Sequence, residues 1–249
     1  MISRISQSFE KMFPPLLESQ KIWRYMDVLK FASMLKEKGL LFSSAKAFAD
    51  DPFEGSIPWA WITAQKRESR FLNKQKVSPK LGPTKATRTQ LKKEGKWVFV
   101  NCWHISEYES LAMWDRYAGQ NGSICIQTTC GLLRQHLPSS IHIGKVTYFD
   151  HQKDEFVIGN VLSPFMYKRQ SFSSEQELRA IWFDQSAALR SEKPPDFHWE
   201  QVELPKLIVQ VLVRPRTPDW VRNTVSDIAA RYKLNVKVKS SKIDSKPLF

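Results

Sequence analysis

The chain has 249 residues, 42% of them apolar and 25% charged, which is an ordinary balance for a soluble globular protein. This balance excludes disorder over the whole chain, and no apolar run reaches the roughly 18 to 20 residues that a membrane-spanning helix needs. Residues 1–20 lack the apolar core of a secretory signal, so we expect a cytoplasmic protein with no membrane partner. Three cysteines without a C-x-x-C pair and five scattered histidines predict neither a disulfide framework nor a metal site.

The net charge of +13 is concentrated in one segment. Between Lys66 and Lys96 the sequence has eleven Lys or Arg against Glu68 and Glu94, so this stretch carries +9 and leaves +4 for the other 218 residues. Such a cluster suits a phosphate-rich partner such as a nucleic acid, although a solvated surface insertion explains it equally well. Nucleic-acid contacts, if the partner binds here, are expected from Lys66, Arg67, Arg70, Lys74, Lys76, Lys92 and Lys93.

The clearest pattern of elements follows a lead-in of residues 1–20. Residues 21–26 have strand composition, and Asp27 suits the N-cap of a helix because its carboxylate can accept hydrogen bonds from the free amides of the first turn. Apolar residues recur at helical spacing from Val28 to Leu35, and Gly39 fits the end of that helix. A second strand is predicted over residues 40–43.

The middle of the chain continues with a predicted helix and loop in the basic segment and a strand over residues 97–103. Ser106 with Glu109 three residues later matches a capping box, in which the two side chains satisfy each other's backbone amides. The helix that this box opens is expected to end at Gly119. Residues 172–183 suit either a strand or a helix.

The C-terminal part is expected to form a strand–helix–strand unit, with Thr217 as N-cap and Pro218 as first residue of a helix that runs to Arg231. Further strands are predicted over residues 123–128, 145–150, 207–213 and 234–238. Because strands and helices do not alternate regularly, we predict an α+β fold with mixed or antiparallel sheets and flanking helices. The predicted units are a single domain over residues 21–240, a basic insertion at about 64–96 within it, and a tail over 241–249.

The most informative short motif is Glu175-Gln176-Glu177-Leu178-Arg179. Side chains alternate along a strand, so both carboxylates and the guanidinium are expected on one face. Two close carboxylates with a nearby cation can keep one carboxylate ionised and raise the pKa of the other, which suits hydrogen bonding to sugar hydroxyls or stabilisation of an oxocarbenium-like centre. A solvent-facing ladder of ion pairs is the alternative interpretation.

Aromatic residues and an arginine form two further candidate sites. Arg24 and Tyr25 lie at the end of the first strand, just before a helix N-terminus, where a guanidinium can hold a phosphate and a ring can stack on a base. Trp114 and Tyr117 share a helix face and can form one wall of a nucleotide pocket, although such a pair also suits the core.

Other familiar motifs are absent or weak. The sequence has no G-x-S-x-G, no P-loop and no G-x-G-x-x-G, and its nine glycines argue against a phosphate cradle of those kinds. Asp50, Asp51 and Glu54 cluster after the second strand, but a turn opened by Asp51-Pro52 explains them better than a metal site does.

Taken in order, these segments resemble domain-of-unknown-function family 2971. The resemblance covers roughly residues 21–240 and rests on WRYMD, LKEKGLLFSSAKAFADDPFEG, NCWHIS, LAMWDRYAGQNGSICI, VTY, the Tyr167-Lys168 region and FSSEQELR. Two segments depart from the family: Asp50 replaces the Asn of its usual Asn-Asp-Pro, and Cys102-Trp103-His104 stands where the family has Cys-Phe-Ser. The family name carries no function.

A more distant resemblance, by order and residue type, is to ADP-ribosyltransferases, which would give the fold an ADP-ribosyltransferase-like core. It implies that Glu177, Glu175 and Arg24 are catalytic, with Glu177 at the nicotinamide ribose. It implies also that NAD is a substrate, held by Arg24, Tyr25, Trp114, Tyr117 and Arg179. The middle Ser-Thr-Ser motif of those enzymes is missing here.

Two classes of function are therefore predicted. The first is an NAD-consuming, effector- or toxin-like enzyme that transfers ADP-ribose to nucleic acid or protein, or hydrolyses NAD, with a neutralising protein as a further partner. The second is a non-catalytic nucleic-acid-binding or interaction module that uses residues 66–96. Convergence of Arg24, Tyr117 and Glu177 on one cleft is the condition that the first class must meet.

Overall fold

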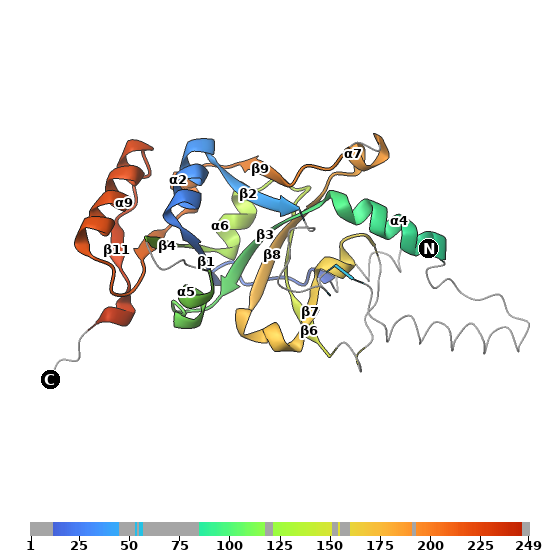
Figure 1. The fold of residues 1–249 in the computed structure, drawn as a ribbon, viewed down its shortest axis with the longest axis horizontal. Helices are drawn as coiled ribbons and strands as arrows, with labels where there is room; N and C mark the ends of the chain where they lie inside the picture. The colour runs from blue at the N-terminus through green and yellow to red at the C-terminus, as the bar shows by residue number, and fades with distance from the viewer. Residues whose placement is uncertain are drawn as a thin grey trace, which may run out of the picture.

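A nine-stranded sheet, antiparallel except where β10 pairs with β11, organises the part of the chain that the structure describes. The computed structural model describes residues 12–44, 53, 55–56, 85–117, 122–150, 154, 160–190 and 193–245. Helices α2, α5 and α9 gather at one end of the molecule, and α4 and α7 lie at the other (Figure 1). The α+β class and the largely antiparallel sheet are therefore confirmed.

The strands of the large sheet follow the order β11-β10-β4-β1-β3-β2-β9, with β8 on β3 and β5 on β8. Their bounds are β1 Lys21–Asp27, β2 Gly39–Ser44, β3 Val98–Ile105, β4 Ser123–Thr129, β5 His142–Lys145, β8 Glu177–Phe183, β9 Phe197–Gln201, β10 Gln210–Val213 and β11 Val238–Ser240. A separate parallel pair consists of β6 Thr147–Phe149 and β7 Tyr167–Arg169.

The helices of the described residues are mostly short. The α-helices are α2 Val28–Glu37, α4 Lys85–Glu94, α5 Leu111–Tyr117, α6 Cys130–His136, α7 Gln185–Arg190, α8 Leu204–Leu207 and α9 Asp219–Arg231. Short 3-10 helices are η2 Gly95–Trp97, η3 Ser163–Phe165, η4 Gln170–Glu175 and η5 Lys242–Asp244. None of the helices in the described ranges is long and apolar enough to cross a membrane.

Strand β3 is the point at which the sheet branches. Along one edge it pairs with β8 from Val98 to His104. Its other edge is shared, because β1 pairs with it only at His104 and Ile105 and β2 only at Phe99 and Val100. Between these two short contacts β1 and β2 diverge from β3, so a fork opens in the sheet (Figure 1).

The β1–α2–β2 unit follows the sequence prediction closely. The carboxylate of Asp27 accepts a hydrogen bond from the Lys30 amide at 2.7 Å, which confirms the predicted N-cap. At the other end Lys38, not Gly39, adopts the left-handed conformation, with φ of 51°. Gly39 is instead the first residue of β2, where a Cβ would lie 2.5 Å from the Glu200 carbonyl oxygen, so its lack of a side chain permits close approach of β9.

The predicted capping box at Ser106 and Glu109 is wrong. Helix α5 begins at Leu111, and the hydroxyl of Ser110 accepts from the Met113 amide at 3.4 Å. The carboxylate of Glu109 reaches the far end of the chain instead, where it accepts from the hydroxyl of Ser241 at 2.6 Å. A long-range contact has replaced the local one, which spacing along the sequence could not reveal.

Several predicted boundaries also shift. Thr217 does not cap α9, which begins at Asp219 with Pro218 at the N-cap and no side-chain cap bond. The strand predicted over 207–213 begins only at Gln210, because α8 occupies the preceding residues. The strand predicted over 234–238 is β11, displaced toward the C-terminus, and the one predicted over 145–150 is split between β5 and β6.

Candidate active site

A cavity of about 570 Å³ occupies the fork between β1 and β2. Its wall comes from both branches of the sheet, from α2 and α5, and from the segment that precedes β8. Polar and charged lining residues include Arg24, Lys30, Cys102, His104, Arg116, Tyr117, Lys168, Glu175 and Glu177. Aromatic lining residues include Trp23, Tyr25, Trp103, Phe197 and Trp199.

Glu177 is the first residue of β8, and Arg179, two residues along the same strand, holds its carboxylate. Nε of Arg179 lies 2.8 Å from Oε1 and Nη2 lies 2.9 Å from Oε2, so the pair is bidentate. Burial by itself would raise the pKa of Glu177. The charge and hydrogen bonds of Arg179, helped by Lys168, outweigh that effect and lower the pKa to about 2. Glu177 is therefore ionised at neutral pH.

Glu175 is a second buried carboxylate, and it contacts Lys168, the cation that also lies beside Glu177. Its Oε2 accepts from Nζ of Lys168 at 2.6 Å, and the same Nζ lies 3.4 Å from Oε2 of Glu177. Oε1 of Glu175 accepts from the Tyr117 hydroxyl at 3.0 Å and pairs with Nη2 of Arg116 at 3.0 Å. Lys168 therefore bridges two carboxylates that both line the cavity.

The local backbone differs from the prediction of one continuous strand through this motif. Glu175 ends η4, Gln176 adopts a left-handed conformation with φ of 39°, and β8 begins only at Glu177. The left-handed residue turns the chain between the two carboxylates, yet both still reach Lys168. The alternative of a solvent-facing ladder is wrong, because both carboxylates and Arg179 are buried.

Arg24 is the cation of the cavity that lacks a carboxylate partner among the described residues. Its one hydrogen bond there runs from Nη2 to the Leu41 carbonyl across the fork, at 3.2 Å. Burial lowers the pKa of the guanidinium to about 10, so it remains charged at neutral pH. A half-buried cation with several unused N–H donors at a cavity wall is a fitting position for an anionic group of a ligand.

His104 lies on β3, where that strand is flanked by β1 on one side and by β8 on the other. Its Nδ1 lies 2.6 Å from the backbone carbonyl of Glu175, and its ring lies edge-on to Tyr25 with centroids 6.3 Å apart. Burial lowers the pKa of His104 below its ordinary value. The imidazole therefore borders the cavity in its neutral form at neutral pH.

Besides Arg24, the four other predicted ligands of NAD fall into two groups. Tyr25 and Tyr117 line the cavity, and burial raises the pKa of each hydroxyl, so both are neutral. Trp114 is fully buried behind Tyr25, with ring centroids 5.0 Å apart, and belongs to the core, not to the cavity wall. Arg179 is also fully buried and serves as the counter-ion of Glu177, so neither it nor Trp114 is placed to touch a ligand.

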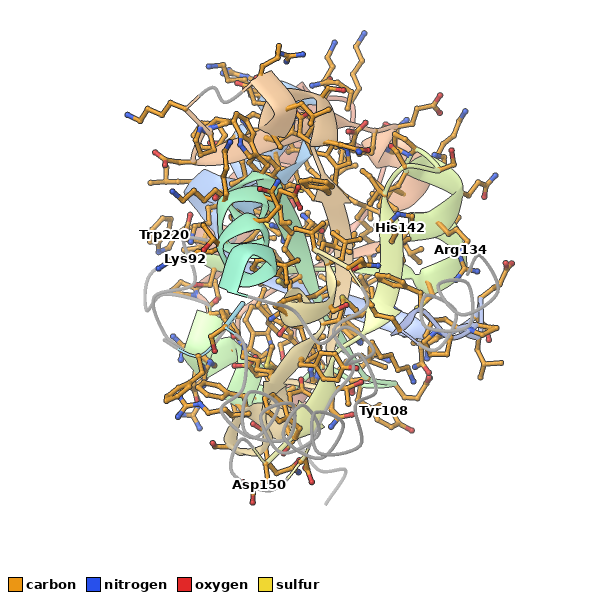
Figure 2. The ribbon with its side chains drawn as sticks, turned by 90° about the vertical axis from the view of Figure 1, so that its right-hand side faces the viewer. Lys92, Tyr108, Arg134, His142, Asp150 and Trp220 are labelled. Carbon is orange, nitrogen blue, oxygen red and sulfur yellow. The ribbon has the colours of Figure 1, made fainter. Side chains whose placement is uncertain are left out.

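Of the predicted nucleic-acid contacts, the structure describes Lys92 and Lys93, and neither lines this cavity. Lys66, Arg67, Arg70, Lys74 and Lys76 lie outside the described residues, as do Asp50, Asp51 and Glu54. Lys92 and Lys93 are exposed in the last turn of α4, and Figure 2 shows Lys92 on this helix. No group of His, Cys, Asp or Glu in the described part of the chain could hold a metal ion.

Sequence reasoning missed Lys168, Arg116 and His104 as members of the site. Lys168 lies in a three-residue strand, and Arg116 is the neighbour of Tyr117 on α5. Both stand in segments that carry the family resemblance, but no motif or spacing marked either as a site residue. His104 did carry a local signal, because it stands at a departure from the pattern of the family that the sequence resembles.

Comparison with known proteins gives no further information on the roles of these residues. No family model matches the chain, and no curated protein matches it. The resemblances noted in the sequence therefore stay predictions. The function is inferred from the chemistry of the cavity.

Proposed function

We propose that the protein binds NAD in the cavity of the fork and cleaves the bond between nicotinamide and ribose, passing ADP-ribose to an acceptor or to water. The observation that supports this proposal is that Arg24, Tyr117, Glu175 and Glu177 line one cavity, although they come from four separate elements. If Arg24, Tyr117 and Glu177 lay on opposite faces of the fold, this hypothesis would have been rejected.

The charge of the cavity favours a ligand with phosphate groups. Its lining has four cations, Arg24, Lys30, Arg116 and Lys168, against the carboxylates of Glu175 and Glu177, a balance of +2. Arg24 is the member whose charge is not offset by a nearby carboxylate in the described residues. It is proposed to hold the diphosphate of NAD, for which a guanidinium supplies a planar set of donors.

The two carboxylates supply the negative charge that the reaction needs. As the bond to nicotinamide breaks, positive charge develops on the ribose, and a fixed anion in a water-poor site stabilises it. Glu177 remains ionised because of its low pKa, so it is suited to electrostatic stabilisation and not to proton transfer. Glu175 is proposed to help by orienting the acceptor.

Size and aromatic lining support a dinucleotide-sized ligand. A volume of about 570 Å³ lies within the range of small-molecule sites, and such sites are mostly apolar with few polar anchors. Tyr25 and Trp23 come from β1, and Trp199 and Phe197 come from β9 on the other branch. These rings are proposed to contact the nicotinamide and adenine rings.

The experiment measures nicotinamide release from NAD by wild type, Glu177→Gln and Glu175→Gln, with Glu107→Gln as an exposed-carboxylate control. We expect Glu177→Gln to lower the rate by about 10² to 10³, the usual cost of removing one electrostatic group. Glu175→Gln is expected to reduce transfer to an acceptor more than hydrolysis. Equal rates in wild type and Glu177→Gln would reject the assignment, and loss only in Glu175→Gln would reverse the two roles.

Nucleic acid remains the second candidate ligand, through a different surface. The exposed lysines at the end of α4 and the neighbouring Lys96 continue the basic run that begins at Lys66. Phosphate contacts from this surface would fit either a nucleic-acid acceptor of ADP-ribose or a purely binding role.

A further inference from the structure

His104 is the residue of β3 that is paired with both β1 and β8. Its Cα is paired with that of Trp23 on β1 and with that of Glu177 on β8. Directly opposed residues of antiparallel strands project to the same face, with Cβ atoms roughly 5 Å apart. His104 and Glu177 are therefore neighbours on the same wall of the cavity.

The hydrogen bond at Nδ1 determines which ring nitrogen carries the proton. A backbone carbonyl only accepts, so Nδ1 must donate to the Glu175 carbonyl, which lies 2.6 Å away. In the neutral ring Nε2 is then left as an acceptor. Among the described residues Nε2 has no hydrogen-bond partner.

The groups around His104 come from three elements. Tyr25 faces it from β1, Glu177 from β8, and Glu175 from the end of η4. Glu175 favours the protonated ring, but burial outweighs it and lowers the pKa below the ordinary value of 6.5. The ring is thus an unprotonated base at neutral pH, whose tautomer is fixed by the same segment that carries Glu175.

We propose that Nε2 of His104 accepts the proton of the hydroxyl or water that replaces nicotinamide at the ribose carbon. This inference rests on the proposed NAD cleavage. The bond from the ribose carbon to the ring nitrogen breaks, and its electron pair neutralises the nicotinamide. An oxygen lone pair of the nucleophile forms the new bond, and the released proton moves to Nε2 and later to solvent.

The variants that test this step are His104→Asn and His104→Gln. Asn places an amide donor near the Nδ1 position, so it can keep the bond to the Glu175 carbonyl while it removes the base. His142→Asn is the matched control, because His142, labelled in Figure 2, is a half-buried histidine of β5. It is not among the residues that line the cavity. Nicotinamide release from NAD is measured from pH 5 to pH 9, with and without added imidazole, together with thermal stability with and without NAD.

For wild type and His142→Asn we expect a rate that falls as pH drops below the pKa of His104. For His104→Asn we expect a rate lower by about 10² at pH 8 that no longer follows this titration and that imidazole partly restores. NAD should still stabilise the variant. His104→Gln should behave in the same way and stands in if His104→Asn does not fold.

Three results would overturn the proposal. A wild-type rate and pH profile in both His104 variants would show that Nε2 accepts no proton. Loss of the NAD-induced stabilisation in both variants would show that His104 binds substrate and does not act as a base. A wild type that releases no nicotinamide would overturn the proposed function itself, and this step with it, which distinguishes that failure from the other two.

Discussion

The cavity region and helix α4 hold charged residues under opposite physical conditions. At the cavity wall and directly behind it, Glu175, Glu177 and Arg179 are removed from water, and each is satisfied by a fixed partner. On α4, Lys92 and Lys93 are exposed to solvent. Buried charges are costly to separate and hold one geometry, whereas exposed charges act through a field that salt screens.

This comparison ranks the expected effects of mutation. A change inside the buried cluster should alter the stability of the fold, a change at Arg24 should alter ligand binding, and a change on α4 should alter only the response to salt. Each of these three expectations can be measured separately.

Glu177→Gln should have the largest effect on stability. It leaves the guanidinium of Arg179 buried without its counter-charge, and breaking a buried pair in this way costs about 3 to 5 kcal/mol. The control is Glu107→Gln, which removes a surface pair with Lys21 and should cost less than about 1 kcal/mol. Denaturant unfolding of both variants at pH 7 measures the difference, and equal losses would show that burial does not separate the two pairs.

The same pair predicts an acid transition in the wild type. The folded pKa of Glu177 is about 2 against an ordinary value of 4.5, so its contribution is present above pH 4.5 and is lost as the pH falls toward 2. The shift corresponds to about 3 kcal/mol. Stability measured from pH 6 to pH 2 should fall more steeply in wild type than in Glu177→Gln.

Arg24→Ala should have an intermediate effect that is confined to the ligand. NAD at about 100 times its Kd would stabilise wild type by roughly 2.7 kcal/mol, a rise of about 5 to 10 °C in Tm. The variant should lose this rise while its own Tm changes little, because Arg24 has one backbone hydrogen bond and no carboxylate partner in the described residues. Arg222→Ala, a surface arginine paired with Asp219, is the control. Absence of any rise in wild type at millimolar NAD contradicts NAD binding.

The smallest effect is expected from the basic segment. Replacing Lys74, Lys76, Lys92 and Lys93 with Ser should weaken nucleic-acid binding at low salt and reduce the slope of log affinity against log salt by about 0.7 to 0.9 per lost phosphate contact. Thermal stability should not change. The matched control replaces Lys206, Lys233, Lys237 and Lys239, which are exposed elsewhere. If affinity and slope stay the same in the first variant, the segment is solvated surface only.

Local patterns predicted those elements whose determinants lie close together in the chain. The β1–α2–β2 unit was predicted correctly because the Asp27 cap and the apolar spacing of α2 act within one or two turns. The capping box at Ser106 was wrong because Glu109 bonds instead with Ser241, which no local rule can anticipate. The left-handed conformation of Gln176 was likewise missed. It is coupled to the contacts of Glu175 and Glu177 with Lys168, which comes from a different strand, and no local rule predicts those contacts.

By itself, the sequence determined the α+β class, the position of Arg24 before a helix, and the closeness of Glu177 to Arg179. Only the tertiary structure decided that Arg24, Glu175 and Glu177 share a cavity, and that Lys168 bridges the two carboxylates. It also decided that Trp114 and Arg179 are buried behind the cavity wall. The physical reason is that β1 and β2 each pair with only two residues of β3, and the fork between them depends on strand register. These pairings join segments that lie more than 50 residues apart in the chain, and residue spacing within each segment does not reveal which partner it will meet.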